Sequence, residues 1–156
     1  PLKEKIQFAG KETEVIPTSQ LDLDEVYYQK TMVDIPPAPK GKTTLKPLGL
    51  VFGARSGDKG GCANLGLWAK TSKAYSFLSE FLTTSKLKEL LPDLNEFEID
   101  RYELPNILSL NFYIHGILED GVSSNSRKDG QAKSLGEYIR AKKVKMPIEI
   151  MEDQVE

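Results

Sequence analysis

The segment from residue 97 to residue 118, FEIDRYELPNILSLNFYIHGIL, alternates apolar and polar residues on both sides of Pro105-Asn106. A period of two is typical of half-buried strands, and a Pro-Asn pair favours a turn. The segment therefore predicts an antiparallel hairpin. Its second strand, expected over 108–118, places Leu108, Leu110, Phe112 and Ile114 on one face and Ser109, Asn111, Tyr113 and His115 on the other.

The segments around this hairpin predict the rest of the domain. Apolar runs at 48–54 and 63–69 indicate two strands, joined by a loop over 55–61 that contains three glycines. Thr71-Ser72 favours the start of a helix that runs to about Leu91, where Pro92 follows. A second helix is expected over 131–142 and a short edge strand over 146–150. The order β-β-α-β-β-α-(β) predicts an α+β, ferredoxin-like two-layer sandwich with an extra N-terminal strand.

The first part of the chain differs from this domain in composition. Four prolines lie between residues 34 and 47 and favour a semi-extended linker. Before them, acidic residues after Ser19 indicate a short helix around 22–30. We therefore expect residues 1–45 to be the tail of a preceding region plus the linker, residues 46–150 to be the folded domain, and residues 151–156 to be a C-terminal tail.

Composition excludes several classes of function. The 156 residues include 21 Lys and Arg against 23 Asp and Glu, a net charge of −2, so nothing attracts the chain strongly to nucleic acid or to an anionic membrane. One cysteine and one histidine predict neither a disulfide framework nor a Cys- and His-rich metal site. No apolar run approaches the length of a membrane span. These features predict a cytoplasmic domain without metal, with mitochondria left open as the compartment.

The glycine-rich stretch at 55–61 is the first candidate site. Its spacing matches neither a P-loop nor a nucleophile elbow. Arg55 and Lys59, with several unhindered backbone N–H groups, suit a phosphate or a carboxylate. The alternative is a tight connection in which Arg55 pairs with Asp58.

Three other segments contain residues with possible catalytic or binding roles. Asn111 and His115 are expected on one face of a strand, where His115 would serve as a general base or be a surface histidine. Cys62 is either a reactive thiol or a buried structural one. Residues 119–145 contain seven basic and four acidic residues, which favour either a phosphate site or a solvated helix end.

Taken in order, the motifs resemble one family. RSGDKG at 55–60 is followed by ANLG at 63–66, YELP at 102–105, LNF at 110–112, and Asp129, Gln131 and Lys133. Over about residues 46–142 this succession is similar to the C-terminal domain of the acyclic terpene utilisation protein AtuA and its relatives. The resemblance implies a ferredoxin-like domain that follows a larger domain of unknown function. It also implies a degradative pathway with acyl-CoA intermediates.

The chain departs from the family pattern at three positions. Gly61 and Cys62 stand where relatives commonly have an acidic residue and Thr or Ser, and Ala132 stands where they usually have glycine. An alanine there bears on any role that requires close backbone approach. The family supplies no assigned catalytic residue.

Two functions of different classes follow. The first is an accessory module without its own chemistry, which contributes assembly and an anion-binding loop to a site shared with the larger N-terminal AtuA-like domain, in cis or in trans, and which forms a homo-oligomer. The second is an enzyme domain that acts on an acyl-CoA or a small carboxylate, with Arg55 and Lys59 as an anion clamp and Asp58 or His115 as the base. No cofactor, nucleic acid or membrane is expected, and a CoA ester is the expected ligand. The predicted ligand-binding set is Arg55, Ser56, Gly57, Lys59, Gly60, Asn64, Asn111, Asp129 and Lys133.

Overall fold

The computed structural model describes residues 4–15 and 33–152, which belong to two separate units, 1–31 and 32–156. In the first unit, β1 (Glu4–Phe8) and β2 (Lys11–Val15) form an antiparallel hairpin that the sequence did not predict. Ala9 and Gly10, both at positive φ, make its turn, as in the two-residue turns that suit hairpin twist. The helix predicted over 22–30 lies outside the described residues.

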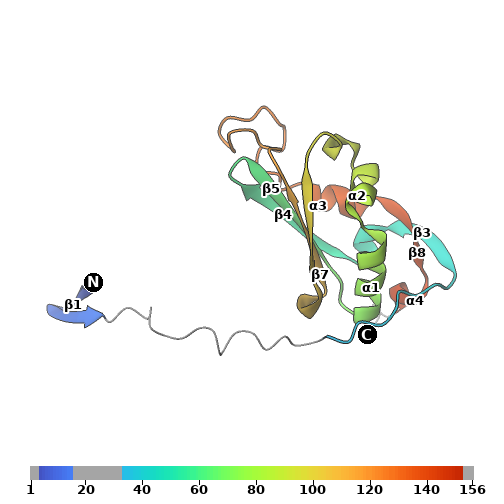
Figure 1. The fold of residues 1–156 in the computed structure, drawn as a ribbon, viewed down its shortest axis with the longest axis horizontal. Coiled ribbons are helices and arrows are strands. Elements are labelled where there is room, and N and C mark those ends of the chain that lie inside the picture. Colours follow the sequence, from blue (N-terminus) through green and yellow to red (C-terminus); the bar gives the residue numbers. More distant parts are fainter. Residues whose placement is uncertain (1–3, 16–32, 153–156) are drawn as a thin grey trace. The chain divides into compact units, whose positions relative to one another are not determined.

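The second unit is built on a four-stranded antiparallel sheet in the order β4-β5-β7-β6. Its strands are β4 (Gly53–Lys59), β5 (Cys62–Trp68), β6 (Ile99–Leu104) and β7 (Ser109–Ile114). The helices α1 (Ser72–Phe81), α2 (Thr84–Leu90) and α3 (Leu135–Ala141) lie on one side of this sheet (Figure 1). The α+β class and the ferredoxin-like fold are confirmed.

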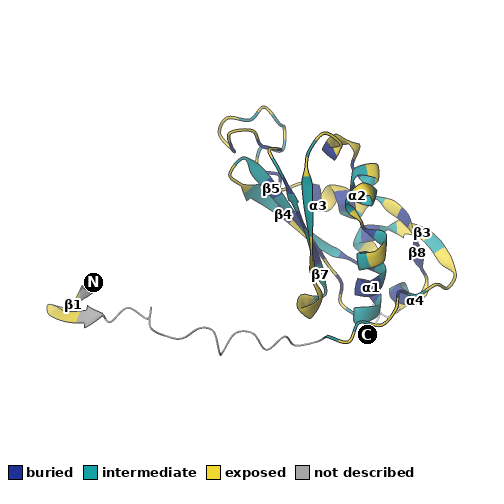
Figure 2. Cartoon of the chain, in the orientation of Figure 1, coloured by how far each residue is buried: buried dark blue, intermediate teal, exposed yellow. Residues whose placement is uncertain are grey.

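The hairpin of β6 and β7 agrees with its sequence pattern. Leu110, Phe112 and Ile114 are fully buried under the helices, whereas Asn111 and Tyr113 on the opposite face are only partly buried. The same alternation continues in β5, where Ala63, Leu65 and Leu67 join the core. In Figure 2, buried stretches occur both on the strands of this sheet and on the helices beside it. One face of the sheet is therefore core, and the other is left open.

The strand predicted over 48–54 is wrong in its first half. Leu48–Leu50 is a short 3₁₀ turn, in which the N–H groups of Val51 and Phe52 both donate to the Leu48 carbonyl, at 3.1 and 2.9 Å. This turn buries Leu48 and Phe52 together in the core, and an apolar run by itself does not distinguish such a turn from a strand.

The loop predicted over 55–61 is also wrong, because Arg55–Lys59 continues β4 and only Gly60 and Gly61 form a turn. Gly60 has a φ of 63°. A Cβ on Gly61 would collide with the backbone oxygen of Glu119. Glycine weakens a strand because it adds no side chain to the packing, but β4 pairs with β5 along its whole length and this pairing holds it extended.

The single helix predicted from residue 72 to 91 is wrong, because the structure has two helices with a break at Leu82. Thr71 caps α1 as expected, since its hydroxyl oxygen accepts from the N–H of Ala74 at 3.2 Å. Thr83 caps α2 in the same way, and accepts from the N–H of Lys86 at 3.1 Å. The polar run Thr83-Thr84-Ser85 thus starts a second helix, since hydroxyl side chains favour caps over helix interiors.

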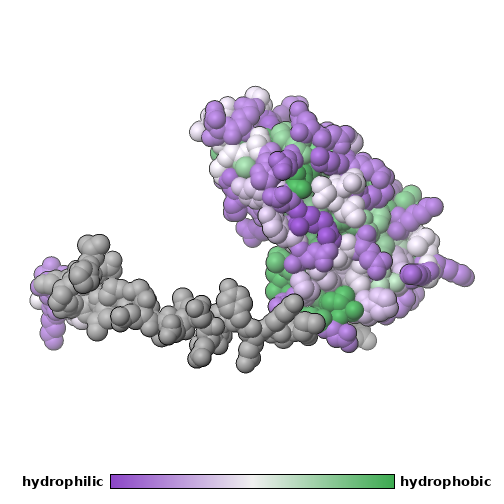
Figure 3. All heavy atoms as spheres, in the orientation of Figure 1, coloured by the Kyte–Doolittle hydropathy of each residue, from purple (hydrophilic) through white to green (hydrophobic). Residues whose placement is uncertain are grey.

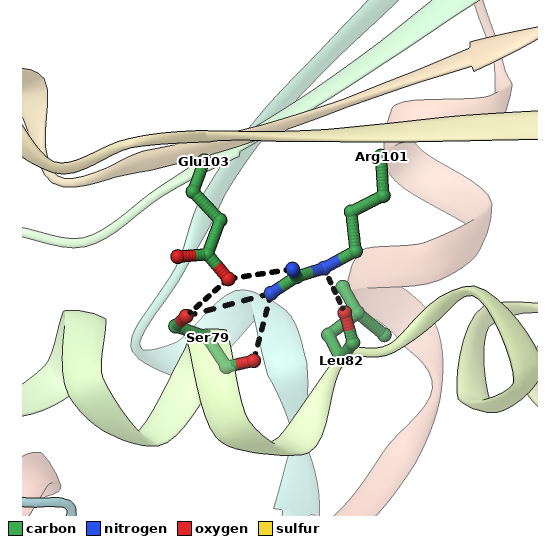
Figure 4. Close-up of polar contacts among 4 residues, drawn as sticks. All are labelled: Ser79, Leu82, Arg101 and Glu103. Carbon is green, nitrogen blue, oxygen red and sulfur yellow. Dashed lines mark hydrogen bonds and ion pairs between the residues drawn. The ribbon is translucent and has the colours of Figure 1, made fainter.

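The C-terminal end of α1 is tied to the sheet by Arg101 of β6 (Figure 4). Its Nε donates to the carbonyl of Leu82 at 3.0 Å and its Nη2 to the carbonyl of Ser79 at 2.7 Å. Its Nη1 donates to Oε1 of Glu103 at 2.6 Å, and the same oxygen accepts from the Ser79 hydroxyl at 3.0 Å. Arg101 therefore satisfies carbonyls that a helix end leaves without partners.

Glu103 provides a test of this cluster by pH. Its hydrogen bond with Arg101 lowers the pKa of Glu103 below the ordinary value. A carboxyl with a lowered folded-state pKa stabilises the fold above its unfolded pKa, and that contribution is lost as the pH falls through the folded pKa. We expect Glu103→Gln to reduce the fall in melting temperature between about pH 5 and pH 3. Because the side chain is half exposed, the effect is below about 1 kcal/mol.

The matched control for this pH experiment is Glu96→Gln, at an exposed position outside the cluster. Melting curves of the parent and both variants over the acid range make the comparison. The same acid dependence in the parent and in Glu103→Gln would contradict the stabilising role given to the Glu103 carboxylate.

Three other predicted ranges are wrong at their ends. The helix predicted over 131–142 is α3, which begins later. The edge strand predicted over 146–150 is β8 (Lys143–Pro147), which begins and ends earlier, and α4 (Glu149–Glu152) follows it. The strand predicted over 108–118 ends at Ile114, where a series of turns begins.

The extra N-terminal strand of the predicted order was the one over 48–54, of which only the end belongs to β4. A strand that the sequence did not predict, β3 (Thr43–Pro47), begins in the expected linker and is held extended by its pairing with β8 in a second, two-stranded sheet. The face of this unit drawn in Figure 3 is largely hydrophilic, with scattered apolar patches. Within the described ranges, no helix is long and apolar enough to span a membrane.

Candidate functional site

A cavity of about 360 Å³ lies at the β4 edge of the four-stranded sheet. Most of its lining belongs to β4, with further contributions from β5 and from the segment just before α3. We call it the β4 cavity. Its lining residues are Arg55, Ser56, Gly57, Asp58, Lys59, Asn64, Gly66 and Lys133.

Strand alternation decides which side chains β4 offers on the open face of the sheet. Arg55, Gly57 and Lys59 alternate with Ser56 and Asp58, so the two cations share one face and a bare glycine lies between them. Across the strand pair, Gly57 is opposite Asn64 and Arg55 is opposite Gly66. Two glycines thus leave the backbone uncovered between the cations, which lets a ligand approach closely.

Lys133 reaches the cavity from a distant part of the chain, through a turn held by Asp129. Its backbone N–H donates to Oδ1 of Asp129 at 2.9 Å, and Ser134 donates to Oδ2 through its N–H at 2.9 Å and its hydroxyl at 2.6 Å. Ala132, at a φ of 53°, lies in the left-handed region that favours glycine. Asp129 itself does not line the cavity, so the structure gives it the role of positioning Lys133.

Ser56 joins the cavity wall to α3. Its hydroxyl oxygen accepts from the N–H of Gly136 at 2.9 Å, across 80 positions of sequence, and the side chain is buried. A Cβ on Gly136 would lie only 3.3 Å from the Cα of Arg55, so the glycine permits the close approach of α3 to β4. The Ser56 hydroxyl therefore fixes the helix that follows Lys133.

The charges around the β4 cavity favour an anion. Arg55, Lys59 and Lys133 contribute three positive charges and Asp58 one negative charge, a local balance of +2. Arg55, Lys59 and Lys133 are also exposed. A guanidinium and two ammonium groups beside open backbone suit a carboxylate or a phosphate.

Asn111 lies next to the β4 cavity and outside its lining. Its Oδ1 accepts from Nδ2 of Asn64 at 3.5 Å, a weak contact longer than ordinary N–H···O hydrogen bonds. Both amides are partly buried on the open face. Asn111 is placed to orient Asn64 rather than to line the cavity itself.

His115 belongs to a separate cluster on the open face. Its Nε2 lies 2.8 Å from Oδ2 of Asp100, and its ring meets Tyr113 edge-on with centroids 4.9 Å apart. The Sγ of Cys62 accepts from the N–H of Gly116 at 3.4 Å. A hydrogen bond with Cys62 raises the pKa of Tyr113. None of these residues lines the β4 cavity, so Asp58 and His115, the two candidate bases, lie in different places.

The structure thus brings most of the predicted ligand-binding set together. Arg55, Ser56, Gly57, Lys59, Asn64 and Lys133 line one cavity with the candidate base Asp58, while Gly60 belongs to the hairpin turn. Gly66 was missed, although it was part of the ANLG motif. The signal that would have found it is the alternation of β5, which places Gly66 on the same face as Asn64.

The comparisons with known proteins agree with this architecture. A family model described as the AtuA ferredoxin-like domain matches residues 47–145, more than half of the chain. No curated protein and no solved structure gives a match. The matched range includes the four-stranded sheet and every residue that lines the β4 cavity.

Proposed function

The chain belongs to the AtuA ferredoxin-like domain family, and on that premise we propose that it is an accessory module that holds an anionic group in the β4 cavity. The observation that supports this most is the convergence of Arg55, Lys59 and Lys133 on one cavity. Lys133 is far from the other two in sequence, and a dedicated turn around Asp129 holds it there. A solvated charged surface does not require such an arrangement.

The pathway and the ligand proposed for this module rest on the name of its family. We propose that the anion is a carboxylate or the phosphate of a CoA ester, in a pathway related to the use of acyclic terpenes. The module would present this anion to a larger AtuA-like domain, in the same chain or another, within a cytoplasmic homo-oligomer. The open face of the sheet, where Tyr102 is exposed, supports a contact with such a partner, since aromatic residues are enriched at interfaces.

Anion binding can be tested on the full chain by titration with inorganic phosphate, malonate and CoA. We expect saturable shifts of the backbone amides of Gly57, Lys59 and Asn64 in ¹H–¹⁵N spectra, and a rise in melting temperature. Lys59→Ala should weaken binding about 5- to 10-fold, because one charge-assisted contact is lost, on the order of 1 kcal/mol. Binding should also weaken as the salt concentration rises.

Lys145→Ala is the matched control for this titration. It removes the same charge from an exposed position on β8, in the other sheet, and should leave the affinity unchanged. If Lys59→Ala and Lys145→Ala bind phosphate, malonate and CoA as tightly as the parent, the anion-binding function is wrong.

The alternative function, an enzyme domain, uses the same cavity but predicts turnover of the bound ligand. Asp58, which lines the cavity, would be the base. Turnover of an acyl-CoA by the isolated chain, abolished in Asp58→Asn while CoA still binds, would replace the accessory function with the catalytic one. Binding without turnover, with a defined oligomer in sedimentation, supports the accessory module.

A further inference from the structure

A second cavity lies at the other end of β4. It measures about 360 Å³ and is lined by the 3₁₀ turn and the start of β4, by Trp68 and Lys70, and by Arg140 of α3. We call it the Trp68–Arg140 pocket. No residue lines both cavities, but Gly53 of this pocket is only two residues from Arg55 of the β4 cavity, about 7 Å along the strand.

Two glycines make room for the large side chains of the pocket. A Cβ on Gly53 would collide with the indole ring of Trp68, and a Cβ on Gly49 would lie 3.0 Å from the Cβ of Arg140 and 3.1 Å from its Nε. Trp68 therefore lies against bare backbone at Gly53, and the stem of Arg140 lies against bare backbone at Gly49. Both side chains are held in place by packing.

Arg140 is oriented and still has donors to offer. Its Nη1 donates to both carboxylate oxygens of Glu137, at 3.0 and 3.1 Å, which holds the guanidinium. Its Nε lies against Gly49 and is shielded from solvent, so it is out of a ligand's reach although it has no hydrogen-bond partner in the described part of the chain. Glu137 binds Nη1 alone, so the N–H donors of Nη2 are left for a ligand.

The pocket combines this cation with exposed apolar surface. Trp68 is 43% exposed and Leu50 is 55% exposed, and Lys70 adds a second exposed positive charge. An indole face beside a guanidinium and an ammonium suits a ligand that has both a flat apolar body and an anionic group. A purely inorganic anion would leave the apolar surface exposed.

We propose that the Trp68–Arg140 pocket binds an aromatic or similarly flat organic carboxylate, with the ring on Trp68 and the carboxylate on Arg140 and Lys70. Glu137 competes for the same guanidinium and so limits the affinity. This site is separate from the β4 cavity and does not depend on the function proposed for it.

Trp68 is the only tryptophan of the chain, so its indole N–H signal in ¹H–¹⁵N spectra reports on this pocket alone. The probe is 1-naphthoate, titrated into the full chain. We expect a saturable shift of that signal. The neutral analogue 1-naphthalenemethanol should bind about tenfold more weakly, because it lacks the charge-assisted contact, and acetate should leave the indole signal in place.

Variants separate this proposal from its alternatives. Arg140→Met keeps the apolar stem over Gly49 and should weaken 1-naphthoate binding about tenfold. Lys70→Met, at an exposed position that does not threaten folding, should weaken it about threefold. Glu137→Gln should strengthen binding about two- to threefold, since the guanidinium is released. Lys145→Ala, at an exposed position of β8 that lines neither cavity, should leave the shift of the indole signal unchanged.

Three results would overturn the proposal. The first is a 1-naphthoate titration that moves the Gly57 and Lys59 amides and leaves the indole signal unchanged. The second is equal binding of 1-naphthoate and 1-naphthalenemethanol, which would show a merely apolar contact. The third is unchanged affinity in both Arg140→Met and Lys70→Met. If phosphate, malonate and CoA all fail to bind in the β4 cavity, only the accessory function is refuted and this proposal stands.

Discussion

Phe112→Ala is expected to lower the free energy of unfolding by about 3–5 kcal/mol, the usual cost of removing a buried aromatic side chain. Phe112 lies in the middle of β7 and is fully buried. Its neighbours across the sheet are Leu65 on β5 and Arg101 on β6. Since the strands and helices pack around this position, the cavity left by alanine has little freedom to collapse. Urea unfolding followed by circular dichroism measures the change.

Tyr102→Ala is the control for the Phe112 substitution. Tyr102 is on the neighbouring strand and is 51% exposed on the open face, so its loss should cost less than about 1 kcal/mol. If Phe112→Ala does not fold, Phe112→Leu keeps most of the volume and should cost less than about 1.5 kcal/mol. A cost below about 1.5 kcal/mol for Phe112→Ala would mean that β7 does not form the centre of the core.

Arg101→Met is expected to cost about 2–3 kcal/mol, the second-largest effect. The methionine keeps the apolar stem and removes the guanidinium that bonds the carbonyls of Ser79 and Leu82 and the carboxylate of Glu103. Two carbonyls at the end of α1 then lose their partners, in a place where Arg101 is only 19% exposed. Hydrogen exchange of the α1 amides should therefore speed up more than that of α3.

Lys86→Met is the matched control for Arg101→Met. Lys86 forms an exposed ion pair with Glu89 at 2.7 Å, and its loss should cost about 0.2–0.5 kcal/mol. Comparison with Glu103→Gln separates the two parts of the cluster, because Gln keeps the shape and removes only the ion pair. If Arg101→Met costs no more than Glu103→Gln, the bonds to the helix carbonyls contribute nothing measurable.

Several features of the fold could be read from neighbouring residues. The alternation in 97–104 and 108–114 predicts two strands with their buried faces, since strand side chains alternate whatever the partner strand is. Thr71 at the start of α1 is similarly local, because a cap bonds an N–H only three residues away. The RSGDKG motif pointed to the correct family and to most of the lining of the β4 cavity.

The wrong secondary-structure predictions fall where a short residue pattern is compatible with two different local structures. Arg55–Lys59 was interpreted as a loop because three glycines within residues 57–61 weaken both helix and strand. Pairing with β5 along the whole of β4 outweighs that weakness, and a residue count within the segment does not reveal it. The break at Leu82 was missed for a related reason: the apolar stripe continues across it, while the capping role of Thr83 depends on the chain leaving the helix there.

The fold class, the hairpin of β6 and β7 and the family follow from the amino-acid sequence, because each depends on residue patterns within short segments. The contacts between residues far apart in the chain, in contrast, depend on how the elements pack. Ser56 bonds Gly136, Lys133 joins Arg55 in one cavity, and Arg140 lies beside Trp68 in another. These contacts depend on how α3 packs against β4. That packing brings together residues some 80 positions apart in the sequence, so no pattern within a short segment predicts it.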